Sequence, residues 1–343
     1  MKRHGNLYEK LTTTENIHLA WQEARRGKSS KDAVRRFEKD AERNLAGIRE
    51  LLVNKTFQSS AYKTKWIYEP KKRLIYILPF DPDRIVHHAL MQVAEPIWTG
   101  LFISDSYACI RKRGLHAGSR RTMEFVRRNR YCLKMDISKF YPSVDHAIMF
   151  DIIRQKIKCP DTLDLFHKII YSVPDGKNVP IGNYTSQWMG NLYLSELDMF
   201  VKHTLRVKDY VRYCDDFLLF HDDKAVLNHA AREIESFLAE RLALTLSKCD
   251  LFPVSRGVDF LGYRHFPGYV LLRKSTSIRI RRRLSKLPGL LAAGRITLDR
   301  FRGSVASLSG WMKWANAQNF RLAVEFKRME ELAGHGGIAE AAA

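Results

Sequence analysis

Hydrophobic positions recur every three to four residues over the first part of the chain, a spacing typical of amphipathic helices. The pattern predicts one helix over about residues 12–26 and a second over about residues 31–53. In the second segment, the apolar side chains near one face are Val34, Phe37, Leu45, Ile48 and Leu52. Both segments also carry many charges, so each helix is expected to bury one face and expose the other.

Between residues 62 and 80 the helical spacing gives way to short apolar runs, which predict strands. The runs Trp66-Ile67-Tyr68 and Leu74-Ile75-Tyr76-Ile77-Leu78 flank the polar segment Glu69-Pro70-Lys71-Lys72-Arg73. We interpret the three segments as a β-hairpin with a basic tip. A helical pattern follows over about residues 83–98.

The middle of the chain alternates between the two patterns. A strand is predicted over residues 131–136, and helices are predicted over about residues 143–158, 185–205 and 224–242. Two apolar runs within residues 211–220 predict a strand, a tight turn and a strand, with Asp215 and Asp216 at the tip and Cys214 on a buried strand. A second hairpin is predicted from residues 257–266 and 269–273, around Pro267-Gly268.

Strands and helices are thus mixed along the chain without an internal repeat, which predicts the α+β class. The clearest shift in composition is the stretch from residue 263 to residue 294, which contains no Asp or Glu. It suggests a boundary between a mixed body and a basic, helical C-terminal unit. Trp311 and Trp314 are expected in the core of that unit, and residues 336–343 are expected to form a disordered tail.

The chain has a net charge of +21, from 58 Lys and Arg against 37 Asp and Glu. Such an excess indicates a polyanionic partner, with nucleic acid as the first candidate. An anionic membrane surface is the alternative, but no long basic amphipathic helix stands out and no apolar run is long enough to span a membrane. The N-terminal residues contain no apolar signal core, so we expect a cytoplasmic protein.

The spacing of the cysteines bears on metal binding and on disulfide bonds. The five cysteines are widely separated and include no C-x-x-C pair. This argues against a zinc site and against a disulfide framework.

The candidate chemistry lies in three carboxylates. Asp215 and Asp216 are adjacent, Asp is a poor strand residue, and two like charges side by side repel. A solvated hairpin tip is one interpretation; the other is half of a site for a hard divalent cation, which prefers oxygen ligands. Asp136 ends a separate strand, and two-metal phosphoryl transfer requires acidic groups that hold two cations roughly 3.5–4 Å apart. A strand-end Asp facing the Asp pair would build such a site compactly.

Read in order, these motifs resemble those of the reverse transcriptases. Tyr213-Cys214-Asp215-Asp216 matches their Y-x-D-D motif, and Asp136 followed by Tyr141 matches their first palm motif. The other matching segments are Tyr68-Glu69-Pro70-Lys71-Lys72-Arg73, Asp83-Arg84-Ile85-Val86, Pro180-Ile181-Gly182-Asn183-Tyr184-Thr185-Ser186-Gln187, Leu244-Thr245-Leu246-Ser247-Lys248 and Phe260-Leu261-Gly262-Tyr263. Any one motif is modest evidence, but several in the family's order make a chance match very improbable.

The resemblance is closer to one branch, the reverse transcriptases of diversity-generating retroelements. Most relatives have Gln-Gly and a proline after the serine in the glycine-led motif, whereas this chain has Ile181-Gly182 and ends in Ser186-Gln187. A retron, group II intron or phage-defence reverse transcriptase is the alternative. A catalytically silent RNA-binding scaffold is a third hypothesis, against which the intact acids argue.

The resemblance implies a right-hand polymerase of the α+β class. It places N-terminal helices and fingers in residues 1–100, a palm in residues 101–265 and a basic helical thumb in residues 266–335. It also implies error-prone synthesis of DNA from dNTPs on a template-repeat RNA, with mutagenesis at template adenines. A basic accessory variability protein is the implied protein partner, and the product is an RNA/DNA duplex.

For the catalytic centre, the resemblance implies that Asp136 and Asp215 are the main ligands of two Mg²⁺ ions, with Asp216 supporting them. Arg73 would bind the triphosphate of the incoming nucleotide. Tyr141 would lie under the sugar and exclude a 2′-hydroxyl, with an ordinary core aromatic as the alternative.

Around that centre, Gly182 would allow close backbone approach to substrate or template, and Ile181 with Gln187 would shape the nucleotide site. Lys248 matches a position proposed to protonate the leaving pyrophosphate, although a surface lysine is almost equally consistent. The primer grip would be Phe260, Leu261, Gly262 and Tyr263, whose aromatics are expected to be partly core.

Overall fold

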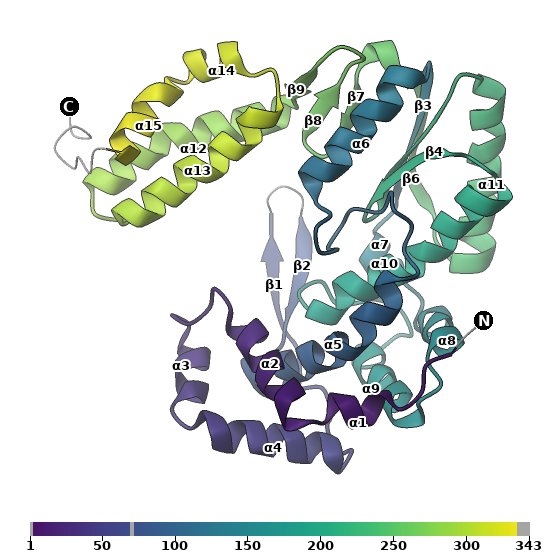
Figure 1. Cartoon of the computed structure of the whole chain (residues 1–343), viewed down its shortest axis with the longest axis vertical. Helices are drawn as coiled ribbons and strands as arrows, with labels where there is room; N and C mark the ends of the chain where they lie inside the picture. The colour runs from purple at the N-terminus through teal and green to yellow at the C-terminus, as the bar shows by residue number, and fades with distance from the viewer. Residues whose placement is uncertain (1–2, 69–71, 335–343) are drawn as a thin grey trace.

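The computed structural model describes residues 3–68 and 72–334 (Figure 1). It confirms the predicted α+β class, since antiparallel sheets are packed with helices. No helix among the described residues combines the length and apolar character required to cross a membrane.

The N-terminal region is a group of four helices. They are α1 (Leu7–Leu11), α2 (Thr14–Arg25), α3 (Asp32–Glu38) and α4 (Ala41–Val53). The prediction of one continuous helix over residues 31–53 is wrong, because the chain leaves the helical conformation at Asp40 (φ −142°, ψ 57°). The Asn44 side chain donates to the Phe37 carbonyl oxygen at 2.9 Å and so satisfies a carbonyl at the end of α3. All five apolar residues of the predicted face are buried, as expected.

The predicted β-hairpin is confirmed. Strands β1 (Lys63–Ile67) and β2 (Arg73–Ile77) pair antiparallel and project from the body toward the C-terminal helices (Figure 1). Residues 69–71 of its basic tip lie outside the described residues. A kinked turn at Phe80–Arg84, in which Asp81 has non-helical backbone angles (φ −114°, ψ 130°), then leads into α5 (Ile85–Thr99), which is the helix predicted there.

The central sheet has four antiparallel strands in the order β4-β5-β3-β6. These strands are β3 (Tyr131–Ile137), β4 (Asp209–Tyr213), β5 (Asp216–His221) and β6 (Leu246–Pro253). The side chains of β3 alternate between two cores: Leu133 and Met135 join the large core, and Cys132 joins a smaller one that contains Phe125. Strand β6 was not predicted, since it is a sheet edge whose polar residues are largely exposed.

Helices cover both faces of this sheet. They are α6 (Leu115–Arg128), α7 (Phe140–Ser143), α8 (His146–Lys156), α9 (Pro160–Ile170), α10 (Tyr184–Met199), which continues into a π-helical turn at Phe200–Thr204, and α11 (Lys224–Leu242). Residues of α10 and α11 belong to the large core, whereas Phe125 and Val126 of α6 belong to the smaller one. Helices α6 and α9 were not predicted.

A small sheet connects the body to the C-terminal helices. A short 3₁₀ turn at Val254–Arg256 precedes its strands, which are β7 (Val258–Phe260), β8 (Tyr263–His265) and β9 (Val270–Leu272). The hairpin predicted around Pro267-Gly268 is confirmed as the β8–β9 pair. Its first arm is not one strand, however, because Leu261 (φ 55°) and Gly262 (φ 83°) form a tight turn that separates β7 from β8.

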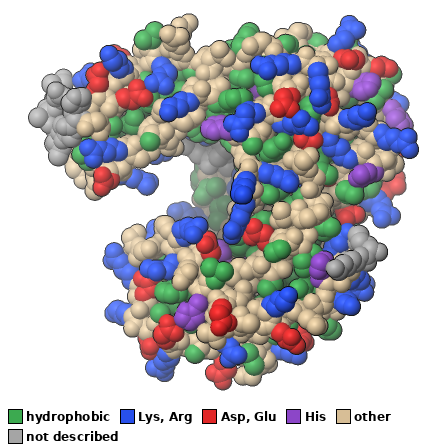
Figure 2. All heavy atoms as spheres, viewed as in Figure 1, with side chains coloured by type: hydrophobic (Ala, Val, Ile, Leu, Met, Phe, Trp, Pro, Cys, Tyr) green, Lys and Arg blue, Asp and Glu red, His purple; other side chains and the backbone are tan. Residues whose placement is uncertain are grey.

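The C-terminal helices form a separate packing unit. They are α12 (Lys274–Ala292), α13 (Leu298–Trp314), α14 (Gln318–Ala323) and α15 (Phe326–Gly334). Their core, which includes Leu284, Phe301 and Phe326, is distinct from the large core of the body. Figure 2 shows a notch between these helices and the N-terminal region, with Lys and Arg side chains on its wall. The tail predicted at residues 336–343 lies outside the described residues.

A buried chain of hydrogen bonds joins this unit to the body. The Trp314 indole N–H donates to Ser119 Oγ at 2.6 Å, and Ser119 Oγ lies 2.6 Å from His265 Nε2. His265 Nδ1 lies 3.1 Å from the Val258 carbonyl oxygen, so the ring is held in one arrangement. Trp314 and Trp311 therefore pack at the junction with the body, where Trp311 contacts Tyr263 at a ring distance of 5.4 Å. Trp311 also packs against the core of the C-terminal helices, as expected.

The buried imidazole makes stability depend on pH. Burial lowers the pKa of His265 from 6.5 to about 4, so between these values it gains a proton only on unfolding. The free energy of unfolding should therefore fall as the pH drops from 6.5 to 4, by about 3 kcal/mol for this residue. Urea unfolding across that range should show a shallower decline for His265→Gln than for the wild type; parallel curves would contradict this account. His87 and His88, with lowered pKa values of about 3 and about 4, should maintain part of the decline in both proteins.

Candidate active site

The three predicted carboxylates meet at one end of the central sheet. Asp136 of β3 pairs directly with Asp216 of β5, so the two side chains leave the same face at adjacent positions. Asp215 lies in the two-residue turn between β4 and β5. Cys214 is the other turn residue, with a φ of 57°, so its predicted place on a buried strand is wrong.

The carboxylates carry a local excess of negative charge. Burial raises the pKa of Asp216 to about 6; the Asp136 charge adds to that rise and Lys134 opposes it. Burial also raises the pKa of Asp215, with a further rise from Asp136 and an opposing effect from Arg73. Asp216 Oδ1 is buried without a hydrogen-bond partner, so a cation would relieve both the repulsion and the unsatisfied oxygen.

This donor set fits Mg²⁺ delivered with a substrate. No three His, Cys, Asp or Glu side chains in residues 3–68 and 72–334 converge closely enough to hold an ion by themselves. Mg²⁺ sites commonly use one or two carboxylates and complete the shell with water and substrate phosphates. Asp136 and Asp215 supply such a pair from two separate elements.

Two neighbouring side chains position these acids, and their roles were not predicted. Ser247 Oγ lies 2.8 Å from Asp136 Oδ2, to which it donates. Lys134, which is only 8% exposed, has its Nζ 3.4 Å from Asp216 Oδ2 and donates to the Asp259 carbonyl oxygen at 2.5 Å. The available signal for Lys134 was a lysine within an otherwise apolar strand.

A buried ion pair fixes the turn that carries Asp215. Arg212 and Asp198 are both fully buried, and Arg212 donates from Nε and Nη2 to the Asp198 carboxylate at 2.7 and 2.6 Å. Arg212 Nη1 also donates to the Cys214 carbonyl oxygen at 3.1 Å. Tyr210 donates to the same carboxylate at 2.7 Å, so α10 anchors the end of β4 and the turn.

Arg73 and Tyr141 lie beside this turn. Arg73 lies at the start of β2. Its positive charge is near enough to Asp215 to oppose the rise in the pKa of that carboxyl. The Tyr141 hydroxyl is 3.5 Å from Cys214 Sγ. A Cβ added at Gly190 would lie 3.2 Å from a ring carbon of Tyr141, so the ring packs closely against α10. The structure therefore brings both predicted substrate contacts close to the aspartates.

Ile181 and Gly182 lie in the loop that precedes α10 and contact the β-hairpin. The Tyr76 backbone N–H donates to the Ile181 carbonyl oxygen at 2.8 Å. Gly182 has a φ of 130°, and a Cβ there would stand 2.1 Å from the Tyr76 carbonyl oxygen. The close approach visible at Gly182 is therefore to the hairpin backbone.

Gly182→Ala is expected to lower the free energy of unfolding by about 1–3 kcal/mol, because the backbone conformation is one that essentially only glycine adopts. The collision with Tyr76 should also separate the hairpin from the loop. The matched control is Gly303→Ala, where the added Cβ meets no atom within 4 Å on α13. Urea unfolding should separate the two variants, and equal stability would contradict the argument.

The remaining predicted residues are more dispersed. Gln187 is exposed on the first turn of α10 and faces a cavity with Arg84 and His88. Lys248 pairs directly with Asp136 across β3 and β6, and its Nζ lies 2.8 Å from Asp250 Oδ2.

The predicted primer grip is the turn between β7 and β8. Phe260 and Tyr263 are fully buried, so both aromatics are core residues. Gly262 faces Trp311 and Thr276 of the C-terminal helices, where a Cβ would meet the Trp311 ring at 2.7 Å.

The chain is similar in sequence to a known family and to individual known proteins. The family described as reverse transcriptase (RNA-dependent DNA polymerase) matches residues 62–265, which is more than half of the chain. Protein YkfC of Escherichia coli (strain K12) is 25% identical over 260 residues, covering 62% of this chain and 66% of that protein. The group II intron-encoded protein LtrA of Lactococcus lactis subsp. cremoris is 21% identical over 169 residues, covering 46% of this chain and 28% of LtrA. The chain thus spans less than two thirds of the length of either relative.

Among solved structures, a telomerase from Candida albicans in complex with a fragment of telomeric RNA is similar to this chain. The two are 12% identical, with a TM-score of 0.49, and the match covers 84% of this chain and 63% of that chain.

Proposed function

Because the chain belongs to the reverse transcriptase (RNA-dependent DNA polymerase) family, we propose that it copies an RNA template into DNA by two-metal nucleotidyl transfer. The meeting of Asp136, Asp215 and Asp216 at one sheet end is the observation that supports this proposal most strongly. The family match spans all three residues.

Reverse transcriptase domains generally use divalent metal ions, typically Mg²⁺. We assign Asp136 and Asp215 as the principal ligands and Asp216 as their support. When bound, the ions would activate the primer hydroxyl and neutralise charge on the triphosphate. Ser247 orients Asp136, and Lys134 holds Asp216 against the backbone of β7.

The other roles follow from position. Arg73 is assigned to the triphosphate, because its guanidinium suits phosphate oxygens and lies near Asp215. Tyr141 is assigned to the sugar, where its ring would exclude a 2′-hydroxyl. Lys248, opposite Asp136, is assigned to protonation of the pyrophosphate.

We divide the chain as a right hand: N-terminal helices and fingers in residues 1–100, palm in residues 101–265 and thumb in residues 266–335. The turn at 260–263 would be the primer grip, supporting the duplex through its backbone while its aromatics stay in the core. The basic notch in Figure 2 suits an RNA/DNA duplex, whose phosphates would neutralise part of the net charge.

The finer assignment is to the diversity-generating retroelements, on the basis of Ile181-Gly182 and Ser186-Gln187. It adds a template-repeat RNA, errors at template adenines and a basic accessory variability protein. The match to LtrA favours a group II intron type as the second candidate. Sequencing cDNA made from a defined RNA with all four bases should reveal substitutions concentrated at adenines; an even error spectrum would favour the second candidate.

Ile181→Gln is expected to lower misincorporation. A glutamine could make a polar contact near the nucleotide sugar that isoleucine cannot make, a contact that contributes about 1 kcal/mol, or roughly fivefold in discrimination. Error rates on one RNA template should fall for Ile181→Gln and remain at the wild-type level for the matched apolar variant Ile181→Val. Unchanged errors in Ile181→Gln would refute the role given to this position.

A further inference from the structure

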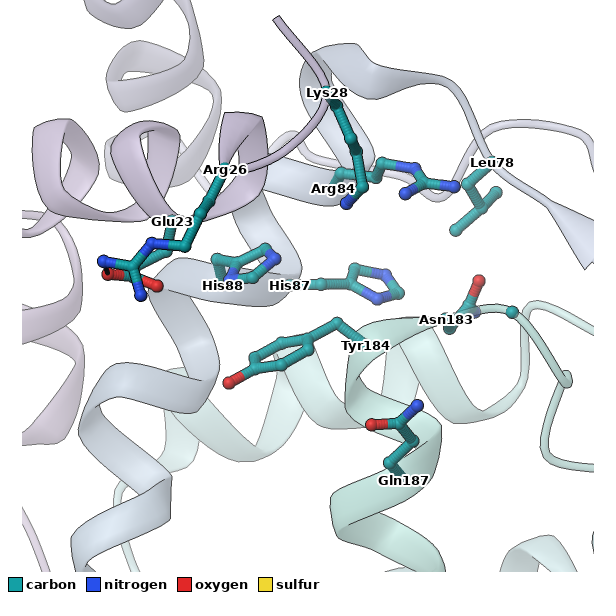
Figure 3. Close-up of a pocket in the computed structure, with 11 residues that line it drawn as sticks. Glu23, Arg26, Lys28, Leu78, Arg84, His87, His88, Asn183, Tyr184 and Gln187 are labelled. Carbon is teal, nitrogen blue, oxygen red and sulfur yellow. Dashed lines mark ion pairs between the residues drawn. The ribbon is translucent and has the colours of Figure 1, made fainter. Parts of the chain in front are cut away.

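A cavity of about 340 Å³ lies between the N-terminal helices and the start of α10, apart from the aspartate cluster (Figure 3). Its walls come from the end of α2 and the residues after it, the exit of β2, the turn before α5, α5 itself and the first turn of α10. Segments distant in the sequence therefore converge on one hollow, to which the proposed polymerase chemistry assigns no role beyond those of Gly182 and Gln187.

The cavity has more positive than negative charge. Arg26, Lys28 and Arg84 line it, and the one carboxylate in its wall, Glu23, is paired with Arg26 at 2.9 Å. Among the described residues, no carboxylate lies within ion-pair distance of Lys28 or Arg84. Burial and the charge of Arg84 lower the pKa of Lys28, which indicates that the two cations lie close together.

A buried ring nitrogen of His87 points into the same space. His87 is 1% exposed, its Nδ1 lies 3.1 Å from Thr185 Oγ1, and its Nε2 has no hydrogen-bond partner. Burial lowers the pKa of His87 to about 3, so the ring is neutral at neutral pH. In the tautomer that accepts from Thr185, Nε2 carries a proton, and Figure 3 shows the ring directed toward the space between Arg84 and Asn183. An unsatisfied buried donor costs about 1–3 kcal/mol, which a ligand oxygen would recover.

The start of α10 adds a third source of positive potential. Asn183 is its N-cap residue but makes no side-chain cap hydrogen bond, and donates instead to the Tyr62 hydroxyl at 2.8 Å. The first N–H groups of a helix have no partner within the helix and favour anions. Helix α10 is long enough, at 16 residues, for this effect to be substantial.

We propose that this cavity binds a phosphodiester group of single-stranded nucleic acid, with Arg84 and Lys28 as its charged contacts and His87 Nε2 as its neutral donor. Two cations beside a helix start suit the single charge of a phosphodiester, whereas a triphosphate carries several charges and normally arrives with a metal ion. The proposal rests on the proposed function, because the strand would be the RNA template.

The direct test is binding of a short, end-labelled single-stranded RNA, measured by fluorescence anisotropy over a range of salt concentrations. Arg84→Gln and Lys28→Gln should each weaken binding about tenfold, the value of one charge-assisted hydrogen bond. The slope of log affinity against log salt should become shallower by about 0.7 for each phosphate that the variant no longer neutralises. Two separate variants keep the test open if one of them fails to fold.

The matched control is Arg43→Gln, which removes a cation that is 86% exposed on the neighbouring helix α4. It should leave RNA affinity unchanged. Equal affinities for the wild type, Arg84→Gln and Lys28→Gln would overturn the proposal.

A second arm separates the strand from a nucleotide. Steady-state extension should give the same KM for dNTP in Arg84→Gln as in the wild type; a raised KM with unchanged RNA affinity would reassign the cavity to the nucleotide triphosphate and overturn the proposal. If the wild type bound RNA through these residues but extended no primer, the proposed polymerase function would fail while the phosphate site remained.

Discussion

Asp215→Asn is expected to reduce primer extension on RNA at least about a thousandfold while leaving RNA affinity unchanged. Asparagine keeps the size of the side chain but removes the charge that the proposed ions require. Metal ions contribute several kcal/mol of transition-state stabilisation, and each 1.36 kcal/mol is a factor of ten in rate. Single-turnover extension with saturating dNTP measures this loss directly.

The matched control for Asp215→Asn is Asp151→Asn on α8, whose side chain is 63% exposed and pairs with Arg154 at 3.5 Å. Its rate should equal that of the wild type. Asp136→Asn should be as severe as Asp215→Asn, whereas Asp216→Asn should cost less because Lys134 already neutralises that carboxylate. A greater loss from Asp216→Asn than from Asp215→Asn would contradict the assignment of the principal ligands.

Asp198→Asn is expected to lower the free energy of unfolding by about 3–5 kcal/mol, because it leaves the fully buried Arg212 charge without a partner. Extension should also fall, since Arg212 holds the Cys214 carbonyl of the turn beside Asp215. Urea unfolding and single-turnover rates should both report the change.

A surface ion pair provides the contrast to Asp198→Asn. Asp299→Asn breaks a pair with Arg302 in which Asp299 is 94% exposed, and should cost at most about 1 kcal/mol. The double variant Asp198→Leu/Arg212→Met removes both buried charges and should be more stable than Asp198→Asn. If Asp198→Asn and Asp299→Asn had equal free energies of unfolding, breaking the buried ion pair would cost no more than breaking a surface pair, which would contradict this prediction.

Periodicity predicted the elements whose apolar residues face a core. Strand β3 and helices α10 and α11 fall into this class. The β1–β2 hairpin was found from its short apolar runs, although its side chains are exposed or only partly buried. Periodicity failed where tertiary contacts decide the local structure. The interruption between α3 and α4 is accompanied by the Asn44 contact with the Phe37 carbonyl, which no hydrophobic pattern encodes. Strand β6 has a largely polar, exposed sequence that only its pairing with β3 makes a strand.

The candidate site was predictable to a similar extent. The three acids were found because each stands in a short motif that has a fixed order along the chain. Lys134 was missed because its partner, the Asp259 carbonyl, is 125 residues away. The cationic cavity was missed for the same reason, since Lys28, Arg84 and His87 come from segments that only the folded chain brings together.

The most direct test of the central claim is incorporation of labelled dNTPs on a primed RNA template with Mg²⁺, by the wild type and by Asp215→Ala/Asp216→Ala. The account predicts template-dependent extension by the wild type and none by the double variant, with equal RNA binding by both. Equal extension by the two proteins, or its absence from both despite RNA binding, would contradict the assignment of a polymerase centre to these aspartates.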